Sequence, residues 1–187
     1  MLVPNNSAVV IIASTISSER PPMLGSFISR ARRLIDVAHA LHIPTIAGRF
    51  PADATETNYL ADTFPNAPKN ALSFHPKPEN WAATDLGQAI AIEGRNQIVV
   101  AGFWLEEAVT LLALNCLAVG YDTYVAGDAT PTTDPGLEIA ARARLAQAGA
   151  VPTSTDQVIR EWAALHDDPV HAIKLIADLP QREQNSP

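Results

Sequence analysis

Short apolar segments alternate with segments of helical periodicity along nearly the whole chain. Six apolar runs have the length of strands: 8–13, 42–47, 71–74, 97–101, 121–126 and 150–152. Apolar residues recur at helical spacing in six longer segments: 24–41, 84–93, 106–119, 134–148, 155–165 and 170–179. Nearly continuous apolar strands that alternate with helices are typical of a parallel sheet covered on both faces. The pattern therefore predicts an α/β fold, a three-layer α/β/α sandwich with a mostly parallel, roughly six-stranded sheet.

The length and composition indicate one domain over residues 1–180, followed by a polar tail at 181–187. The stretch 49–69 reads as a loop with one helical turn around 59–63. Hydrophobic residues make up 47% of the 187 residues and charged residues only 18%. So few charges leave apolar surface that a second copy can cover, and we expect a homo-oligomer.

Net charge and cysteine content limit which partners and which covalent links we expect for the chain. The formal net charge of −7 argues against a nucleic-acid partner. Arg30, Arg32 and Arg33 are interpreted as the solvated face of a helix rather than a phosphate clamp. A single cysteine, Cys116, leaves no internal disulfide. No segment resembles a signal peptide or reaches the ~20 apolar residues of a membrane span, so we expect a cytoplasmic protein without membrane contact.

The most informative stretch is 99–109, where an apolar strand ends at Gly102 and an apolar helix begins near Glu106. Parallel sheets bind ligands beyond the carboxyl ends of their strands. A side chain in the first turn of that helix would face such a crevice, where unpaired backbone N–H groups attract anions and would stabilise a thiolate. This chain places Ala108 there, which has no nucleophile.

Five stretches together resemble the isochorismatase-like family, which includes the cysteine hydrolases related to nicotinamidase and N-carbamoylsarcosine amidase. They are 8–12, 43–46, Trp81 with 84–86, 97–102 and 120–129. The order and spacing of these stretches carry the resemblance, which covers roughly residues 7–165. It implies the α/β fold already predicted, hydrolysis of small amides or related bonds, and assembly into dimers or larger rings.

The resemblance also implies three catalytic positions. Family members that hydrolyse amides use an Asp after the first strand, a Lys before the third helix and a Cys at the start of the helix after strand four. In this chain these positions fall on Ala13, His75 and Ala108, although a shift of two residues would offer Lys77 for the lysine. A methyl group can neither form an acyl intermediate nor move a proton. Members that cleave a vinyl ether dispense with the Cys but keep the Asp, which Ala13 replaces here.

Several residues are candidates for replacement chemistry. His75 could act as a general base or bind an anion, or it could be a loop histidine that lines the crevice. Glu106 and Glu107 are best interpreted as carboxylates that cap the helix start. Cys116 follows Ala108 by eight residues, about 12 Å along a helix axis, and is interpreted as an inert core cysteine.

Other polar residues near the strand ends are weaker candidates. Ser14 and Thr15 could form hydrogen bonds in the crevice, but they lack an evident base. Asp128 is interpreted as a turn or structural carboxylate. The family's metal ligands form an Asp-x-His pair, and the matching loop 49–53 has no histidine. His42 is taken to end the first helix, so we expect neither a metal site nor a cofactor.

The aromatic residues near the strand ends have two interpretations, as walls of an apolar pocket or as packing and subunit contacts. In this family the turn that holds Trp104 and Leu105 often contains a non-prolyl cis peptide. The predicted pocket residues are His75, Lys77, Trp81, Phe103, Trp104, Leu105, Glu106 and Ala108.

Two functional interpretations remain. In the favoured one, the protein keeps the fold and a crevice for a small-molecule ligand but lacks an intact catalytic triad, and it serves in binding or assembly. In the alternative, it is an active hydrolase of small amides or related C–N or ether bonds, with a changed mechanism that uses His75 or Lys77 together with Glu106.

Overall fold

The computed structural model describes residues 1–14, 24–50, 64, 66–76 and 78–177. The expected helical turn at 59–63, Thr15, Lys77 and the tail 181–187 lie outside these residues. Six strands form one sheet in the order β3-β2-β1-β4-β5-β6, and every neighbouring pair is parallel. They are β1 (Ser7–Ser14), β2 (Thr45–Phe50), β3 (Leu72–Ser73), β4 (Gln97–Gly102), β5 (Asp122–Ala126) and β6 (Val151–Thr153).

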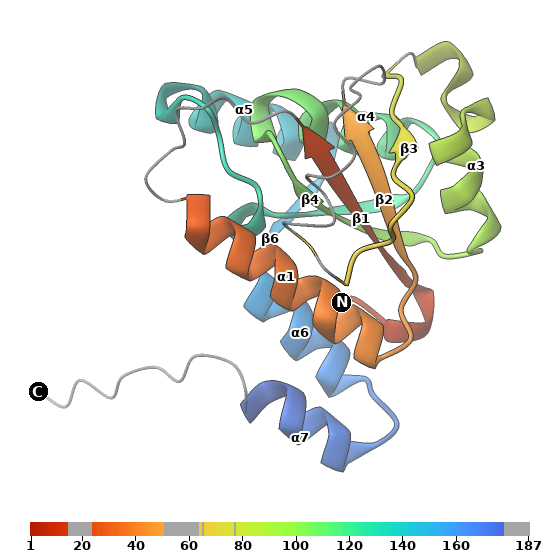
Figure 1. The fold of residues 1–187 in the computed structure, drawn as a ribbon, viewed down its shortest axis with the longest axis vertical. Helices are drawn as coiled ribbons and strands as arrows, with labels where there is room; N and C mark the ends of the chain where they lie inside the picture. Colours follow the sequence, from red (N-terminus) through yellow and green to blue (C-terminus); the bar gives the residue numbers. More distant parts are fainter. Residues whose placement is uncertain (15–23, 51–63, 65, 77, 178–187) are drawn as a thin grey trace, which may run out of the picture.

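Helices cover both faces of the sheet, which confirms the predicted three-layer architecture (Figure 1). One face carries α1 (Leu24–Ala40), α6 (Thr155–Ala164) and α7 (Pro169–Ala177), with α7 packed on α6. The other face carries α3 (Asp85–Ile92), α4 (Thr110–Ala118) and α5 (Pro135–Ala148). Shorter helical segments are η1 (Pro4–Asn6), η2 (Pro78–Ala83), η3 (Leu105–Val109) and η4 (Gly127–Ala129). No helix in the described ranges is both long and apolar enough to cross a bilayer.

The sheet divides the apolar interior into two clusters. Along β1, Val9, Ile11 and Ala13 point into the cluster beneath α1 and α6. Ala8, Val10 and Ile12 point into the cluster beneath α3 and α4. All eight residues of β1 are buried, because strand neighbours flank it and helices cover both of its faces.

Polar side chains fix where several helices begin. Thr84 Oγ1 accepts from the Gly87 N–H at 3.1 Å at the start of α3. Ser154 Oγ accepts from the Gln157 N–H at 3.2 Å at the start of α6. Each cap satisfies a backbone donor that has no acceptor within its own helix.

Two predicted element boundaries are wrong. Residue 42 is not the first residue of a strand, because His42 has a φ of +54° and ends the turn after α1, and β2 begins at Thr45. The predicted helix 106–119 is two segments, since Leu105–Val109 form a π-helical turn before α4. Thr110 Oγ1 donates to the Leu105 carbonyl and supports the wider turn.

Candidate functional site

The strand order places a topological switch point between β1 and β4. Connections leave β1 toward β2 on one side, whereas β4 is followed by β5 on the other side. At such a switch point the loops beyond the carboxyl ends of the strands diverge and leave a cleft. Ala13, Ser14 and Gly102 lie at these strand ends.

Gly102 allows the chain to turn tightly from β4 toward α4. Its φ is +115°, and a Cβ at this position would lie 2.1 Å from the Ile12 carbonyl oxygen. The Phe103 N–H donates to the same oxygen at 2.9 Å. The peptide bond between Phe103 and Trp104 is cis, in the turn where the family resemblance implies a non-prolyl cis peptide. This close approach places the residues after β4 directly on the end of β1.

Aromatic side chains occupy the region beside Ala13. Phe103 and Trp104 are 1% and 5% exposed, and their ring centroids are 5.5 Å apart. Phe64 stacks on Phe103 at 5.8 Å and is itself buried. Ala13 belongs to the same apolar cluster. The methyl group of Ala13 therefore has apolar neighbours.

Ala108 lies in the π-helical turn, on the other side of the sheet from Ala13. Its side chain is fully buried in the cluster that also contains Leu105 and Val109. The N–H groups of Glu107 and Val109 both donate to the Trp104 carbonyl at 3.1 Å. The start of this helix thus offers fewer unpaired backbone donors than the sequence predicts for an anion site.

Glu106 connects the helix start to the loop after β5. One carboxylate oxygen accepts from the Thr133 N–H at 2.8 Å and also from the Thr133 hydroxyl. Its other oxygen, Oε2, is buried and has no hydrogen-bond partner among the described residues. The expected capping role is therefore wrong for Glu106, because its carboxylate binds a neighbouring loop and not the N–H groups of its own helix.

His75 lies at the edge of the sheet, just after β3. Its side chain is exposed and makes no hydrogen bond or ion pair with any described residue. The preceding Phe74 packs edge-on against Trp81, with centroids 5.6 Å apart, and both rings are buried. Trp81 thus contributes to the core beneath α3 and α4. Within the described ranges, no hydrogen bond or ion pair joins His75 to Glu106.

Asp128 holds three elements together. Its Oδ1 accepts from the Thr155 N–H at 2.8 Å and from the Thr155 hydroxyl at 3.1 Å. Arg30 lies 3.9 Å from its other oxygen and pairs with Asp156 at 3.0 Å. These contacts agree with a structural carboxylate. Arg30 is accordingly not simply solvated, since it links α1 to the start of α6.

The remaining nucleophile candidates are buried. Burial raises the pKa of Cys116 from 9.0 to about 12, so the thiolate is scarcely populated at neutral pH. Ser14 is 7% exposed at the end of β1. Neither group has the electropositive, accessible surroundings that an activated nucleophile needs.

Arg49 is a charged residue near the site that the sequence interpretation missed. It lies on β2 in register with Ala13 on β1 and with Ser73 on β3. Its guanidinium donates to Ser73 Oγ at 2.7 Å and to the Ala71 carbonyl at 3.2 Å. The sequence does contain an indication of this position, because Arg49 follows Ala47 by two residues and so lies on the same face of the strand. These two hydrogen bonds attach the short edge strand β3 to the sheet.

Metal ligands do not gather in the part of the chain that the structure describes. No group of three or more His, Cys, Asp or Glu side chains there could hold a metal ion.

Comparison with known proteins agrees with this architecture. Residues 17–157 match the isochorismatase domain. A probable hydrolase, YcaC of Escherichia coli strain K12, is 29% identical over 159 residues, which cover 78% of this chain and 72% of that protein.

Two solved structures of YcaC proteins superpose on most of the chain. YcaC from Pseudomonas aeruginosa, solved with hexane-2,5-diol and covalent acrylamide, is 25% identical, with a TM-score of 0.72. The alignment covers 94% of this chain and 87% of that one. The Escherichia coli protein, described as an octameric hydrolase of unknown specificity, is 22% identical, with a TM-score of 0.70 and coverage of 94% and 89%.

Proposed function

Since the chain belongs to the isochorismatase family, we propose that it retains the hydrolase fold as a binding or assembly protein whose amide-hydrolysing site is degenerate. The main observation in support of this proposal is that alanine occupies the two positions where the family resemblance implies an Asp and a Cys. Ala13 is 8% exposed and Ala108 is fully buried. Without a thiolate and a carboxylate, the acyl intermediate and its proton transfers have no group to carry them.

The surroundings of both alanines support this proposal. Phe103 and Trp104 pack in the cluster that contains Ala13, so a carboxylate there would lose hydration. Cys116 does not supply the missing thiolate, because burial raises its pKa to about 12. His75 is exposed at the sheet edge and makes no described contact with Glu106.

Assembly into a homo-oligomer is the second part of the proposal. Leu137 and Ile139 on α5 are 45% and 80% exposed, and Val151 on the edge strand β6 is 44% exposed. Exposed apolar groups of this size favour burial against another surface. The octameric state described for YcaC of Escherichia coli supports the same expectation.

An active hydrolase of small amides with a changed mechanism is the alternative function. The observation that favours it is the buried, unpartnered Oε2 of Glu106 near the helix start. A desolvated carboxylate oxygen is a competent proton acceptor. In this alternative, Glu106 acts together with His75 or Lys77.

Turnover assays separate the two functions. The purified full chain is tested with small amides, carbamoyl compounds and isochorismate, beside the variants His75→Ala and Glu106→Gln. His39→Ala is the matched control, because His39 is also exposed but lies on α1. We expect no turnover above background in any protein. Turnover that His75→Ala or Glu106→Gln abolishes and His39→Ala preserves would contradict the degenerate site.

Restoration tests whether residue 108 marks the nucleophile position. Acrylamide alkylates thiolates, and the solved YcaC of Pseudomonas aeruginosa contains covalent acrylamide. We expect Ala108→Cys combined with Ala13→Asp to gain one acrylamide adduct by intact mass. Ala113→Cys, at a position on α4 that is as fully buried as Ala108, is expected to remain unlabelled. Equal labelling of both variants would show that residue 108 is misplaced as the site.

A further inference from the structure

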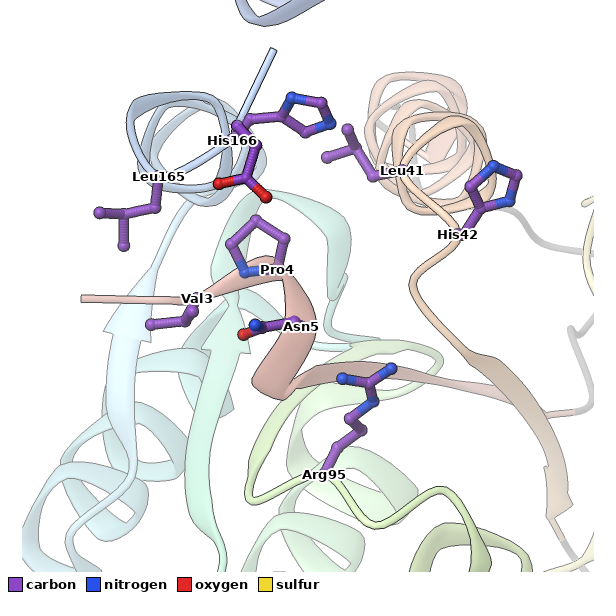
Figure 2. Close-up of a pocket in the computed structure, with 9 residues that line it drawn as sticks. Val3, Pro4, Asn5, Leu41, His42, Arg95, Leu165 and His166 are labelled. Atoms are coloured by element: carbon purple, nitrogen blue, oxygen red, sulfur yellow. The ribbon is translucent and has the colours of Figure 1, made fainter.

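A second cavity lies at the edge of the sheet opposite the candidate active site. Its walls come from η1 before β1, from the turn after α1, from the loop before β4 and from the residues that follow α6. The cavity has a volume of about 310 Å³ (Figure 2). That is the space of roughly ten water molecules, enough for a small metabolite.

Arg95 presents a guanidinium without a partner to this cavity. Figure 2 shows the side chain extending from the loop before β4 into the space between Asn5 and His42. Its Nε is buried and has no hydrogen-bond partner among the described residues. The backbone beneath it is fixed, because the Asn96 N–H donates to Asn6 Oδ1 at 3.1 Å. Arg95 as a whole is partly exposed, so its guanidinium can bind an acceptor that arrives from outside the chain.

His42 occupies a backbone position that normally requires glycine. The Ile43 N–H donates to the Ala38 carbonyl at 2.8 Å, and the His42 N–H donates to the His39 carbonyl at 3.1 Å. This pair of bonds ends α1 with a left-handed residue, and His42 has a φ of +54°. A β-carbon is unfavourable there, whereas glycine is not. Such a departure from local preference is typical of a residue kept for its side chain.

Acidic and imidazole groups from the end of α6 complete the polar lining. Asp167 is exposed and makes no hydrogen bond or ion pair with any described residue. The neighbouring His166 is fixed, because its Nδ1 accepts from the Asp168 N–H at 3.0 Å. The cavity thus combines one unpaired cation, one unpaired carboxylate and two imidazoles.

Ligands with a single charge suit this lining poorly. The carboxyl-terminal ends of α1 and α6 both border the cavity, and together with Asp167 they disfavour an isolated anion. Arg95 in turn disfavours an isolated cation. The side chains of Leu41 and Leu165 add apolar surface between the charged groups.

We propose that this cavity binds a small zwitterion with an apolar body, of the apolar α-amino acid class. The ligand carboxylate binds the guanidinium of Arg95 and the imidazole of His42. The ligand ammonium binds the carboxylate of Asp167, and the apolar body lies against Leu41 and Leu165. The site is independent of the chemistry at Ala13 and Ala108, which lie at the opposite ends of the strands.

Titration calorimetry of the full chain with three matched probes tests the proposal. L-leucine carries both charges, 4-methylpentanoate lacks the amino group, and 3-methylbutylamine lacks the carboxylate. We expect leucine to bind at millimolar concentration and each analogue to bind at least about tenfold more weakly. Absence of leucine binding, or an analogue that binds as tightly as leucine, would overturn the proposal.

Variants then assign the contacts. Arg95→Gln and Asp167→Asn are each expected to weaken leucine binding about tenfold. Arg160→Gln, which removes an exposed arginine from α6, is expected to leave it unchanged. His42→Gly is expected to raise the urea midpoint while weakening leucine binding. A His42→Gly protein that binds leucine as the parent does would overturn the role of His42, and unchanged binding by Arg95→Gln would overturn the site.

Discussion

Replacing Gly102 by alanine is the most direct test of the turn that places the residues after β4 on the end of β1. The new Cβ would lie 2.1 Å from the Ile12 carbonyl oxygen and 2.7 Å from the Ile12 nitrogen. Both are backbone atoms of a fully buried strand and cannot rotate away. β1 and β4 must therefore separate locally, in addition to the cost of a non-glycine residue at a φ of +115°.

The expected loss in the free energy of unfolding has three parts. The left-handed backbone costs ~1–2 kcal/mol for a residue with a β-carbon. Weakening the 2.9 Å hydrogen bond from the Phe103 N–H to the Ile12 carbonyl costs ~1 kcal/mol. Overpacking in the closely packed interior costs ~1–3 kcal/mol. The sum is ~4 kcal/mol, a large share of the ~5–15 kcal/mol of a typical domain.

Gly120→Ala is the matched control, because Gly120 has a φ of +94° and no heavy atom within 4 Å of a built Cβ. Gly120→Ala is expected to lower the free energy of unfolding by the backbone contribution alone, ~1–2 kcal/mol. Gly25→Ala on α1 has neither a positive φ nor a close neighbour, and is expected to stabilise the fold by up to ~1 kcal/mol. Urea unfolding followed by circular dichroism measures all three variants. A Gly102→Ala protein within about 1 kcal/mol of Gly120→Ala would refute the steric argument.

Three further predictions concern buried or capping groups. Cys116 is expected to resist thiol reagents in the native protein and to react after unfolding in urea, because burial raises its pKa to about 12; rapid native labelling would contradict this. Asp128→Ala is expected to cost ~2–3 kcal/mol in urea unfolding, because two donors of the buried Thr155 lose their charged acceptor; Asp128→Asn, which keeps a carbonyl oxygen, should cost less. The N–H groups of His171 and Val170 lower the pKa of Asp168 below 3.8. Its carboxylate therefore stabilises the fold above pH 3.8, and that contribution is lost as the pH falls through the lower folded value. Asp168→Asn should thus destabilise the protein at pH 7 and approach the parent in acid; an equal difference at both pH values would contradict this.

The layers of the fold were predictable because apolar periodicity alone distinguishes its strands from its helices. The run 97–101 is continuously apolar, and β4 is buried throughout. The helix ends at Gly120 and Gly149 also follow from residue type, because both have a positive φ. The π-helical turn at Leu105–Val109 was not predictable, since it depends on the Trp104 carbonyl accepting two N–H groups.

Only part of the candidate site could be predicted from the sequence. The sequence pattern predicted that Ala13 lies near the end of a strand and Ala108 near the start of a helix, as the structure shows. It could not show that Phe64 would stack on Phe103. The cavity around Arg95 is built from four segments that are distant in the chain, and no local motif marks it. One position was unusual in the sequence itself: His42 follows α1 at a place where helices commonly end in glycine. Such a signal becomes interpretable only when the neighbours of His42 are known.

Because the sheet divides the apolar interior, Ala13 and Ala108 can be substituted independently of each other. Ala13 packs beneath α1 and α6, and Ala108 packs beneath α3 and α4. Changes at residues without shared neighbours have nearly additive effects on stability. Substitutions at Ala13 and at Ala108 are therefore each expected to fold without repacking around the other. A double variant can accordingly be built through either single variant first.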